Sequence, residues 1–276
     1  MRERALVTGV LLPVGLYLVW LGGLAYLALI VFLLAVAAWE YVQLFKAGGF
    51  RPSGFLVVGG TIALLASRHV NSLRGAPFYS DTSISVLLIF AALVVHLIDY
   101  ERGARFSGTD FAITLGGFMY LGFAGGFLLP LRYLPDGFWW FLTVLPAVWL
   151  TDTGAYVFGS RFGRRQLSPR LSPKKTWEGF LAGIVTGTLG TALLALGWQA
   201  LAIQPILVTP QKAALIGLII AIFTPLGDLG QSMIKRQVGI KDSGHLLPGH
   251  GGLFDRVDTW IWGAVLGYYT IVWFLT

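Results

Sequence analysis

The chain has 276 residues, of which 56% are hydrophobic, 12% are charged and none is cysteine, and its net charge is +7. A soluble domain carries about a quarter charged residues, so this composition excludes an ordinary soluble protein and indicates a membrane protein. The absence of cysteine excludes disulfides, thiolate metal sites and cysteine nucleophiles.

Apolar segments of helical length recur along the chain, and we expect nine membrane spans. They are 5–21, 24–45, 55–67, 84–100, 111–131, 138–159, 179–203, 212–234 and 259–275. The first is expected to be a retained helix, because no clear cleavage site follows it. The third has only 13 residues and could be re-entrant. The pattern predicts an all-α polytopic integral membrane protein that forms a single membrane domain (1–276), with N-terminal helices in 1–131 and, in 138–276, the helices and loops that carry the polar motifs.

The distribution of positive charge predicts the orientation of these spans. With nine spans, 16 of the 20 Lys and Arg residues lie on the same side as the N-terminus. Because cytoplasmic loops are enriched in Lys and Arg, we expect a cytoplasmic N-terminus and an outside C-terminus. The polar regions 161–178 and 235–258 then share the cytoplasmic face and could build one site.

Asp228 is a carboxylate inside the eighth apolar segment, which requires a partner. On a helix it shares a face with Gln231 and Ser232. Its partner could be basic, in which case Lys235 or Arg236 would form an ordinary ion pair, or it could be a metal ion.

The loop that follows is rich in acids, glycines and histidines. Asp255 and Asp258 are three residues apart and adjoin PGHGG, and such hard carboxylate oxygens suit Mg²⁺. Gly251 and Gly252 could allow backbone amides to approach a phosphate, although a glycine pair is more often a turn. His245 and His250 could be ligands, proton donors or structural residues.

The earlier polar loop is strongly basic. It carries Arg161, Arg164, Arg165, Arg170, Lys174 and Lys175. These cations could neutralise a polyphosphate, or they could be a solvated face or serve only topology. Ser172 or Thr176 could cap the next helix and direct its amides at an anion. Asp152 is a further carboxylate in an apolar span, facing either the site or a packing partner, and Gly183 with Gly187 predicts close helix packing.

The residues from Ser232 to Asp258 read SxxKRxxxxKDxGxxLPGHGGxxDRxD, which resembles the signature of the phosphatidate cytidylyltransferases, also called CDP-diacylglycerol synthases. The GD at 227–228, SPKKTWEG at 172–179 and DTGAY at 152–156 are also similar to that family. The first half of the chain resembles it only in hydropathy. The resemblance implies Mg²⁺-dependent attack of a phosphatidic acid oxygen on the α-phosphorus of CTP, which gives CDP-diacylglycerol and pyrophosphate for phospholipid biosynthesis.

The resemblance also implies a paired-metal centre that uses Asp228 and Asp255, with Mg²⁺ and a second cation whose identity the sequence does not reveal. Gln231 departs from the family, which commonly has Glu there, so its contact with metal is in doubt. The expected catalytic residues are Asp228, Asp255, Lys235, Arg236 and His250. The expected substrate-binding residues are Ser172, Lys174, Lys175, Thr176, Glu178, Asp152, Ser232, Lys241, Asp242, Gly251, Gly252, Arg256 and Asp258.

The expected partners are CTP, phosphatidic acid and the lipid bilayer, with no nucleic acid, and the resemblance makes a homodimer plausible. We expect a bacterial-type inner membrane with the active site facing the cytoplasm. The main alternative is a cation- or proton-coupled secondary transporter in which Asp152 and Asp228 bind the coupling ion. That alternative explains the buried acids but not the PGHGG and SPKK motifs.

Overall fold

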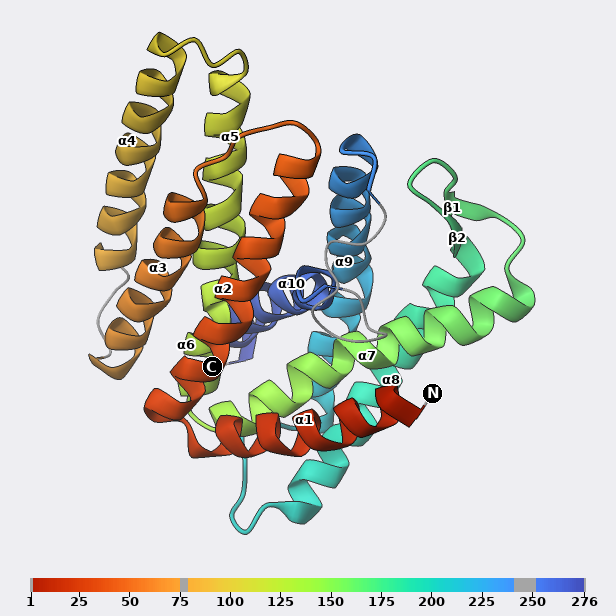
Figure 1. The fold of residues 1–276 in the computed structure, drawn as a ribbon. Helices are drawn as coiled ribbons and strands as arrows, with labels where there is room; N and C mark the ends of the chain where they lie inside the picture. Colours follow the sequence, from red (N-terminus) through yellow and green to blue (C-terminus); the bar gives the residue numbers. More distant parts are fainter. Residues whose placement is uncertain (1, 75–78, 241–251, 276) are drawn as a thin grey trace. The chain divides into compact units, whose positions relative to one another are not determined.

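The computed structural model describes residues 2–74, 79–240 and 252–275 (Figure 1). These residues form two compact units. The first comprises Met1–Pro130 and Lys235–Val257, and the second comprises Leu131–Ile234 and Asp258–Thr276. The single membrane domain expected from the sequence stays a prediction.

The membrane-spanning character of the chain is plain from its helices. Seven helices in the described part are long and apolar enough to cross a membrane. They are Gly23–Ala47, Gly54–Leu73, Asp81–Glu101, Ser107–Tyr133, Gly137–Phe162, Trp177–Leu201 and Pro210–Gln237. Helices also occupy the first and last expected segments, as α1 (Arg2–Leu21) and as α10 (Phe254–Thr270) followed by the π-helix η3 (Ile271–Leu275). The chain is therefore an all-α polytopic membrane protein, whereas the count of nine spans stays a prediction.

The first unit is built mainly from neighbouring helices, of which α3, α4 and α5 lie side by side (Figure 1). After α1 they are α2 (Gly23–Ala47), α3 (Gly54–Arg74), α4 (Tyr79–Glu101) and α5 (Ser107–Gly117). The helical path of α5 continues through a π-helix, η1 (Phe118–Ala124), a 3₁₀ turn, η2 (Gly125–Phe127), and α6 (Leu128–Tyr133). The core of this unit includes the fully buried Leu34, Leu65, Phe118 and Leu121.

A buried ion pair explains why α3 is longer than its apolar segment. The sequence suggested 13 residues, whereas α3 has 21 and continues through Arg68. The Arg68 Nε donates to Asp81 at 2.5 Å, and Arg68 Nη1 donates to the carbonyl of Phe123 at 3.0 Å. Asn71 also donates to Asp81, at 3.1 Å. Since a charge inside the membrane is tolerated when it is paired, the helix can carry this arginine through its C-terminal half.

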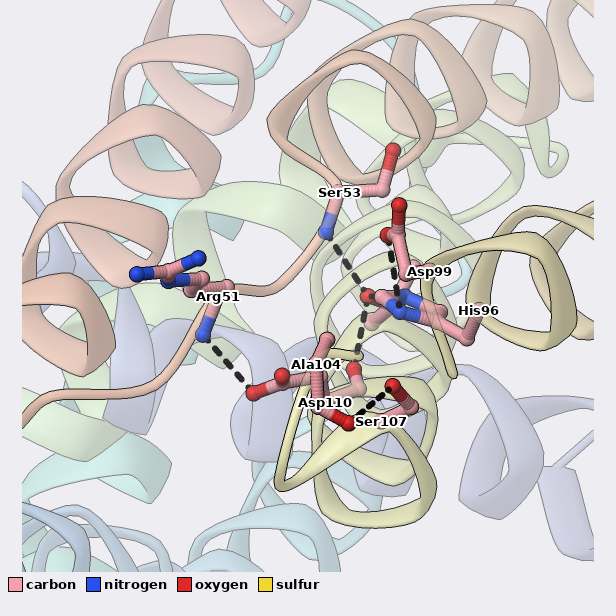
Figure 2. Close-up of polar contacts among 8 residues, drawn as sticks. Arg51, Ser53, His96, Asp99, Ala104, Ser107 and Asp110 are labelled. Carbon is pink, nitrogen blue, oxygen red and sulfur yellow. Dashed lines mark hydrogen bonds and ion pairs between the residues drawn. The ribbon is translucent and has the colours of Figure 1, made fainter. Parts of the chain in front are cut away.

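A second polar cluster fixes the connection between α2 and α3 (Figure 2). The backbone N–H of Arg51 donates to the buried carboxylate of Asp110 at 2.7 Å, and that of Ser53 donates to the Thr114 hydroxyl at 3.0 Å. His96 of α4 lies 2.9 Å from the same hydroxyl. The loop is therefore held to α5 by side chains that satisfy its backbone donors.

In the second unit, α7 (Gly137–Phe162) and α8 (Trp177–Leu201) lie side by side at close distance (Figure 1). A Cβ added to Gly183 would lie 3.0 Å from the carbonyl oxygen of Thr151, and one added to Gly187 would lie 2.3 Å from the Thr151 hydroxyl. Only glycine fits at the second position without displacement of the Thr151 side chain. The predicted close packing at this glycine pair is confirmed.

A short β-hairpin joins α7 to α8, which an all-α expectation misses. Strand β1 (Gln166–Ser168) pairs antiparallel with β2 (Ser172–Thr176), with Ser168 opposite Ser172. This segment is the basic loop of the sequence, where helical periodicity is absent. The unit is completed by α9 (Pro210–Gln237), which ends in the first unit, and by most of α10.

Candidate active site

An ion pair in the second unit joins two of the predicted motifs. The ammonium group of Lys175, in β2, pairs with the carboxylate of Asp228, in α9. The two side chains are 29% and 37% exposed, so the pair is accessible rather than sealed in the core. The sequence identified both residues, but it offered Lys235 and Arg236 as the basic partners of Asp228. The structure pairs Asp228 with Lys175 of β2 instead.

Asp152 belongs to the same group of charges. It lies on α7 and is close enough to Lys175 and Asp228 to interact with both electrostatically. Its side chain is exposed. Of the two alternatives left open by the sequence, the arrangement favours a residue that faces the site over one that serves packing. Two carboxylates and one ammonium group therefore converge from α7, β2 and α9.

Side-chain hydrogen bonds to the backbone fix the junction between β2 and α8. Thr176 is the N-cap of α8, and its hydroxyl accepts a hydrogen bond of 3.1 Å from the Gly179 N–H. The Glu178 carboxylate accepts from the backbone N–H groups of Arg164, at 3.0 Å, and Arg165, at 3.2 Å. Thr176 is thus the cap that the sequence offered as one of two candidates, and Glu178 binds the loop backbone. These bonds hold Lys175 next to the start of a helix.

The other predicted residues of the second unit have varied positions. Ser172 lies in β2 and is partly buried, whereas Lys174 is exposed. Ser232 is partly buried on α9, and Asp258 is buried on α10. Gln231 is only 3% exposed, and its Nε2 has no hydrogen-bond partner among the described residues.

In the first unit, Lys235 and Asp255 form a second ion pair. Lys235 Nζ donates to Asp255 Oδ1 at 2.7 Å, and the side chains are 16% and 14% exposed. Arg236 and Arg256 are exposed and Gly252 is buried. The pair links the last turn of α9 to the first turn of α10. It therefore joins the two ends of the signature segment, which we define as Ser232 to Asp258.

Several predicted residues lie outside the described part of the chain. They are Lys241, Asp242, His245, His250 and Gly251. Their assignments stay predictions.

Glu40 contacts the signature segment, although no sequence motif marks it. Glu40 lies on α2 and is 1% exposed, and its Oε2 accepts a hydrogen bond of 2.8 Å from the Phe254 N–H. The available signal was an acid inside an apolar span, the same signal that identified Asp152 and Asp228.

The carboxylates expected to bind metal fit a hard divalent cation. Asp228 and Asp255 each hold a lysine ammonium group in this structure, which shows that each attracts a cation. Among the described residues, no three His, Cys, Asp or Glu side chains gather into a metal site. Mg²⁺ is commonly bound by one or two carboxylates together with substrate phosphates and water, so each of these carboxylates, taken by itself, has the chemistry of a Mg²⁺ ligand.

Comparison with known proteins covers nearly the whole chain. Residues 2–274 match the model of a family described as the cytidylyltransferase family. A phosphatidate cytidylyltransferase of Synechocystis sp. is 33% identical over 91% of this chain and 90% of its own length. Proteins of the same name from Pseudomonas aeruginosa and Staphylococcus aureus are 32% and 30% identical, over 99% and 95% of this chain and 97% and 95% of their own lengths.

Proposed function

Because the chain belongs to the cytidylyltransferase family, we propose that it transfers the cytidylyl group of CTP to phosphatidic acid, giving CDP-diacylglycerol and pyrophosphate for phospholipid biosynthesis. The observation that carries the proposal is the family match over residues 2–274. The alignments to the named relatives, which cover 90% and 97% of the lengths of the first two, agree with it. A secondary transporter is not favoured, since the matched family is one of nucleotidyltransferases.

The reaction needs alignment and charge neutralisation more than it needs a base. A phosphatidic acid oxygen is anionic near neutral pH, so it can attack the α-phosphorus of CTP directly. The new P–O bond forms as the bond between the α-phosphorus and the bridging oxygen breaks, and that electron pair leaves with pyrophosphate. Lys174, Lys175 and Arg236 are the proposed cations for the triphosphate, because pyrophosphate leaves readily only when its charge is matched.

The Lys175–Asp228 contact supports this role for Lys175. Lys175 directly precedes Thr176, the N-cap of α8, where the Thr176 and Glu178 side chains hold the backbone. A phosphate that binds Lys175 at this place also meets the positive end of the helix dipole. The side chains of this unit can therefore bind an anion and restrain its position.

We assign Mg²⁺ to the carboxylates of Asp228 and Asp255, with a second cation of unknown identity. When bound, such ions shield the repulsion between the two phosphates and stabilise the leaving pyrophosphate. Asp152 supplies further negative charge near Asp228. The carboxylates would hold the cations, and the lysines would complete the neutralisation of the phosphates.

The setting that we propose is a bacterial-type inner membrane crossed nine times, with the N-terminus and the active site on the cytoplasmic side, where CTP is dissolved. The location of 16 of the 20 Lys and Arg residues on that side supports this orientation. Assembly as a homodimer is part of the same proposal and rests on the resemblance to the family.

The direct test follows labelled CTP into lipid. The protein is purified in detergent and incubated with phosphatidic acid, with and without Mg²⁺, while labelled lipid and released pyrophosphate are measured. We expect equal amounts of both products, and only with Mg²⁺ present. A protein that releases no pyrophosphate under these conditions would contradict the assigned reaction.

A further inference from the structure

The first turn of α10 has a backbone donor that its own segment cannot satisfy. The Leu253 carbonyl accepts the first helical hydrogen bonds, from the N–H groups of Arg256 and Val257. The N–H of Phe254 therefore has no partner within the helix. The residue just before the helix is Leu253, whose side chain has no oxygen to accept from any N–H group of this first turn.

Glu40 supplies this cap from a part of the chain 214 residues away. Its Oε2 accepts the Phe254 N–H at 2.8 Å. The bond joins a carboxylate to a helix N-terminus, where a negative charge is favourable and the hydrogen bond is charge-assisted. Within residues 2–74, 79–240 and 252–275, no cation pairs with Glu40, and its Oε1 has no hydrogen-bond partner. The hydrogen bond from the Phe254 N–H is thus the polar contact, among the described residues, that stabilises the Glu40 carboxylate inside an apolar span.

The other end of the signature segment contacts the same helix. A Cβ added to Gly48, just after α2, would lie 2.8 Å from Cγ1 of Val238. Val238 follows Lys235, and Phe254 precedes Asp255. The C-terminal part of α2 therefore contacts the chain next to both members of the Lys235–Asp255 pair, whose atoms are 2.7 Å apart.

We propose that Glu40 is a positioning residue for Asp255: by capping α10 at Phe254 it sets where the Asp255 carboxylate lies relative to Lys235. The inference rests on the proposed function for its kinetic consequence. Its geometric part, that Glu40 protects the Phe254 amide, stands independently. Since a displacement of about 1 Å at a reacting group can cost about 100-fold in rate, loss of the cap should reduce turnover without removing any group that touches substrate.

The test uses two substitutions of similar size that differ in one property. Glu40→Gln and Glu40→Met are both uncharged, but only glutamine has an oxygen that can accept the Phe254 N–H. Tyr26→Phe is the matched control, because it removes a different buried hydrogen bond of α2, from the Tyr26 hydroxyl to the Leu128 carbonyl at 2.6 Å. For each full-length protein, kcat, KM for both substrates, the unfolding temperature and amide hydrogen exchange over 252–258 are measured.

We expect Glu40→Met to lower kcat by at least about tenfold, with both KM values within about threefold of the original, since the lost alignment acts on the transition state. Exchange over 252–258 should accelerate in this variant alone. Glu40→Gln should recover kcat to within about threefold of the original protein, because the amide oxygen restores the acceptor. Tyr26→Phe should lower the unfolding temperature and leave kcat and exchange over 252–258 unchanged.

Three outcomes would overturn the positioning role. One is a Glu40→Met protein with unchanged kcat and exchange, and another is Glu40→Gln that is as impaired as Glu40→Met. The third is a Glu40→Met protein that does not fold, which would assign Glu40 to folding. If the unsubstituted protein makes no lipid product from CTP, the proposed function fails, and the exchange measurement alone decides whether Glu40 caps α10.

Discussion

At the scale of single residues, Lys175 and Asp228 form an ion pair with each other in the site that we propose for the polyanionic triphosphate. A triphosphate that takes Lys175 leaves the Asp228 carboxylate without its ammonium partner. Asp228 would then be free to hold a divalent cation in place of the ammonium group, so both side chains would again have a partner of opposite charge. We therefore expect nucleotide and cation to bind more tightly together than separately.

Asp228→Asn tests the importance of this carboxylate. The substitution keeps the size of the side chain and removes the charge that holds Lys175, so kcat should fall at least about 100-fold while the protein stays folded. Steady-state assays with labelled CTP and a thermal unfolding curve measure the two properties.

Asp136→Asn is the matched control for that substitution. Asp136 accepts the Leu207 N–H in the same unit, and it precedes Asp152 by 16 residues, or about 24 Å along a helix. Its substitution should leave kcat nearly unchanged. Near-normal turnover of Asp228→Asn would exclude Asp228 as a metal ligand.

Individual residues also show where sequence reasoning succeeds. Asp152 and Asp228 are identified because charge is costly inside an apolar span, and Lys175 because it belongs to a cluster of cations in a polar loop, and neither argument needs coordinates. Their mutual proximity depended on the hairpin, whose two short strands leave no periodic pattern in the sequence. Glu40 is also a charged residue inside an apolar span, but it lies far from every recognisable motif in the sequence. Only its hydrogen bond with the Phe254 N–H identifies it.

At the scale of elements, the contact between α7 and α8 carries the hairpin and therefore Lys175. Small residues allow this approach: a Cβ on Gly154 would lie 1.8 Å from the Thr186 hydroxyl, and one on Gly187 would lie 2.3 Å from the Thr151 hydroxyl. The glycine spacing predicted close packing without revealing the partner helix. The sequence underestimates the length of α3 because a hydropathy scale treats Arg68 as an isolated charge. In the structure Arg68 is paired with Asp81, so the helix can continue through it.

Gly187→Ala should weaken the packing of α8. The added methyl group has to displace Thr151, which costs about 1–3 kcal/mol and lowers the unfolding temperature in detergent. Gly197→Ala is the control on the same helix, because a Cβ there meets nothing within 4 Å. Equal unfolding temperatures for the two variants would contradict a tight contact at Gly187.

At the scale of the whole molecule, helices occupy all nine segments that hydropathy indicated, and seven of them meet the length and composition of a span within the described residues. Hydropathy predicts helices in lipid well because backbone groups there have to be satisfied internally. It does not determine orientation, which depends on loop charges. The proposed cytoplasmic active site follows from that charge argument alone.

The orientation can be measured with single cysteines, since the chain contains none. Arg170→Cys, in the hairpin loop, should react with a membrane-impermeant maleimide only after the cells are permeabilised. Pro205→Cys, between α8 and α9, should react in intact cells. Both residues are exposed, so labelling reports sidedness and not burial. The reverse pattern would invert the proposed topology.

The pairing of Arg68 with Asp81 has a consequence for biosynthesis. Translocon insertion of an isolated arginine or aspartate at the centre of a helix costs about 2.5–3.5 kcal/mol, and α3 has the lowest hydropathy of the seven long helices, at 1.2. Arg68 and Asp81 stand near the facing ends of consecutive helices, so each can neutralise the other as soon as both have emerged from the ribosome. We therefore expect α3 and α4 to partition into lipid together as a helical hairpin, with α3 waiting at the translocon until α4 has been synthesised.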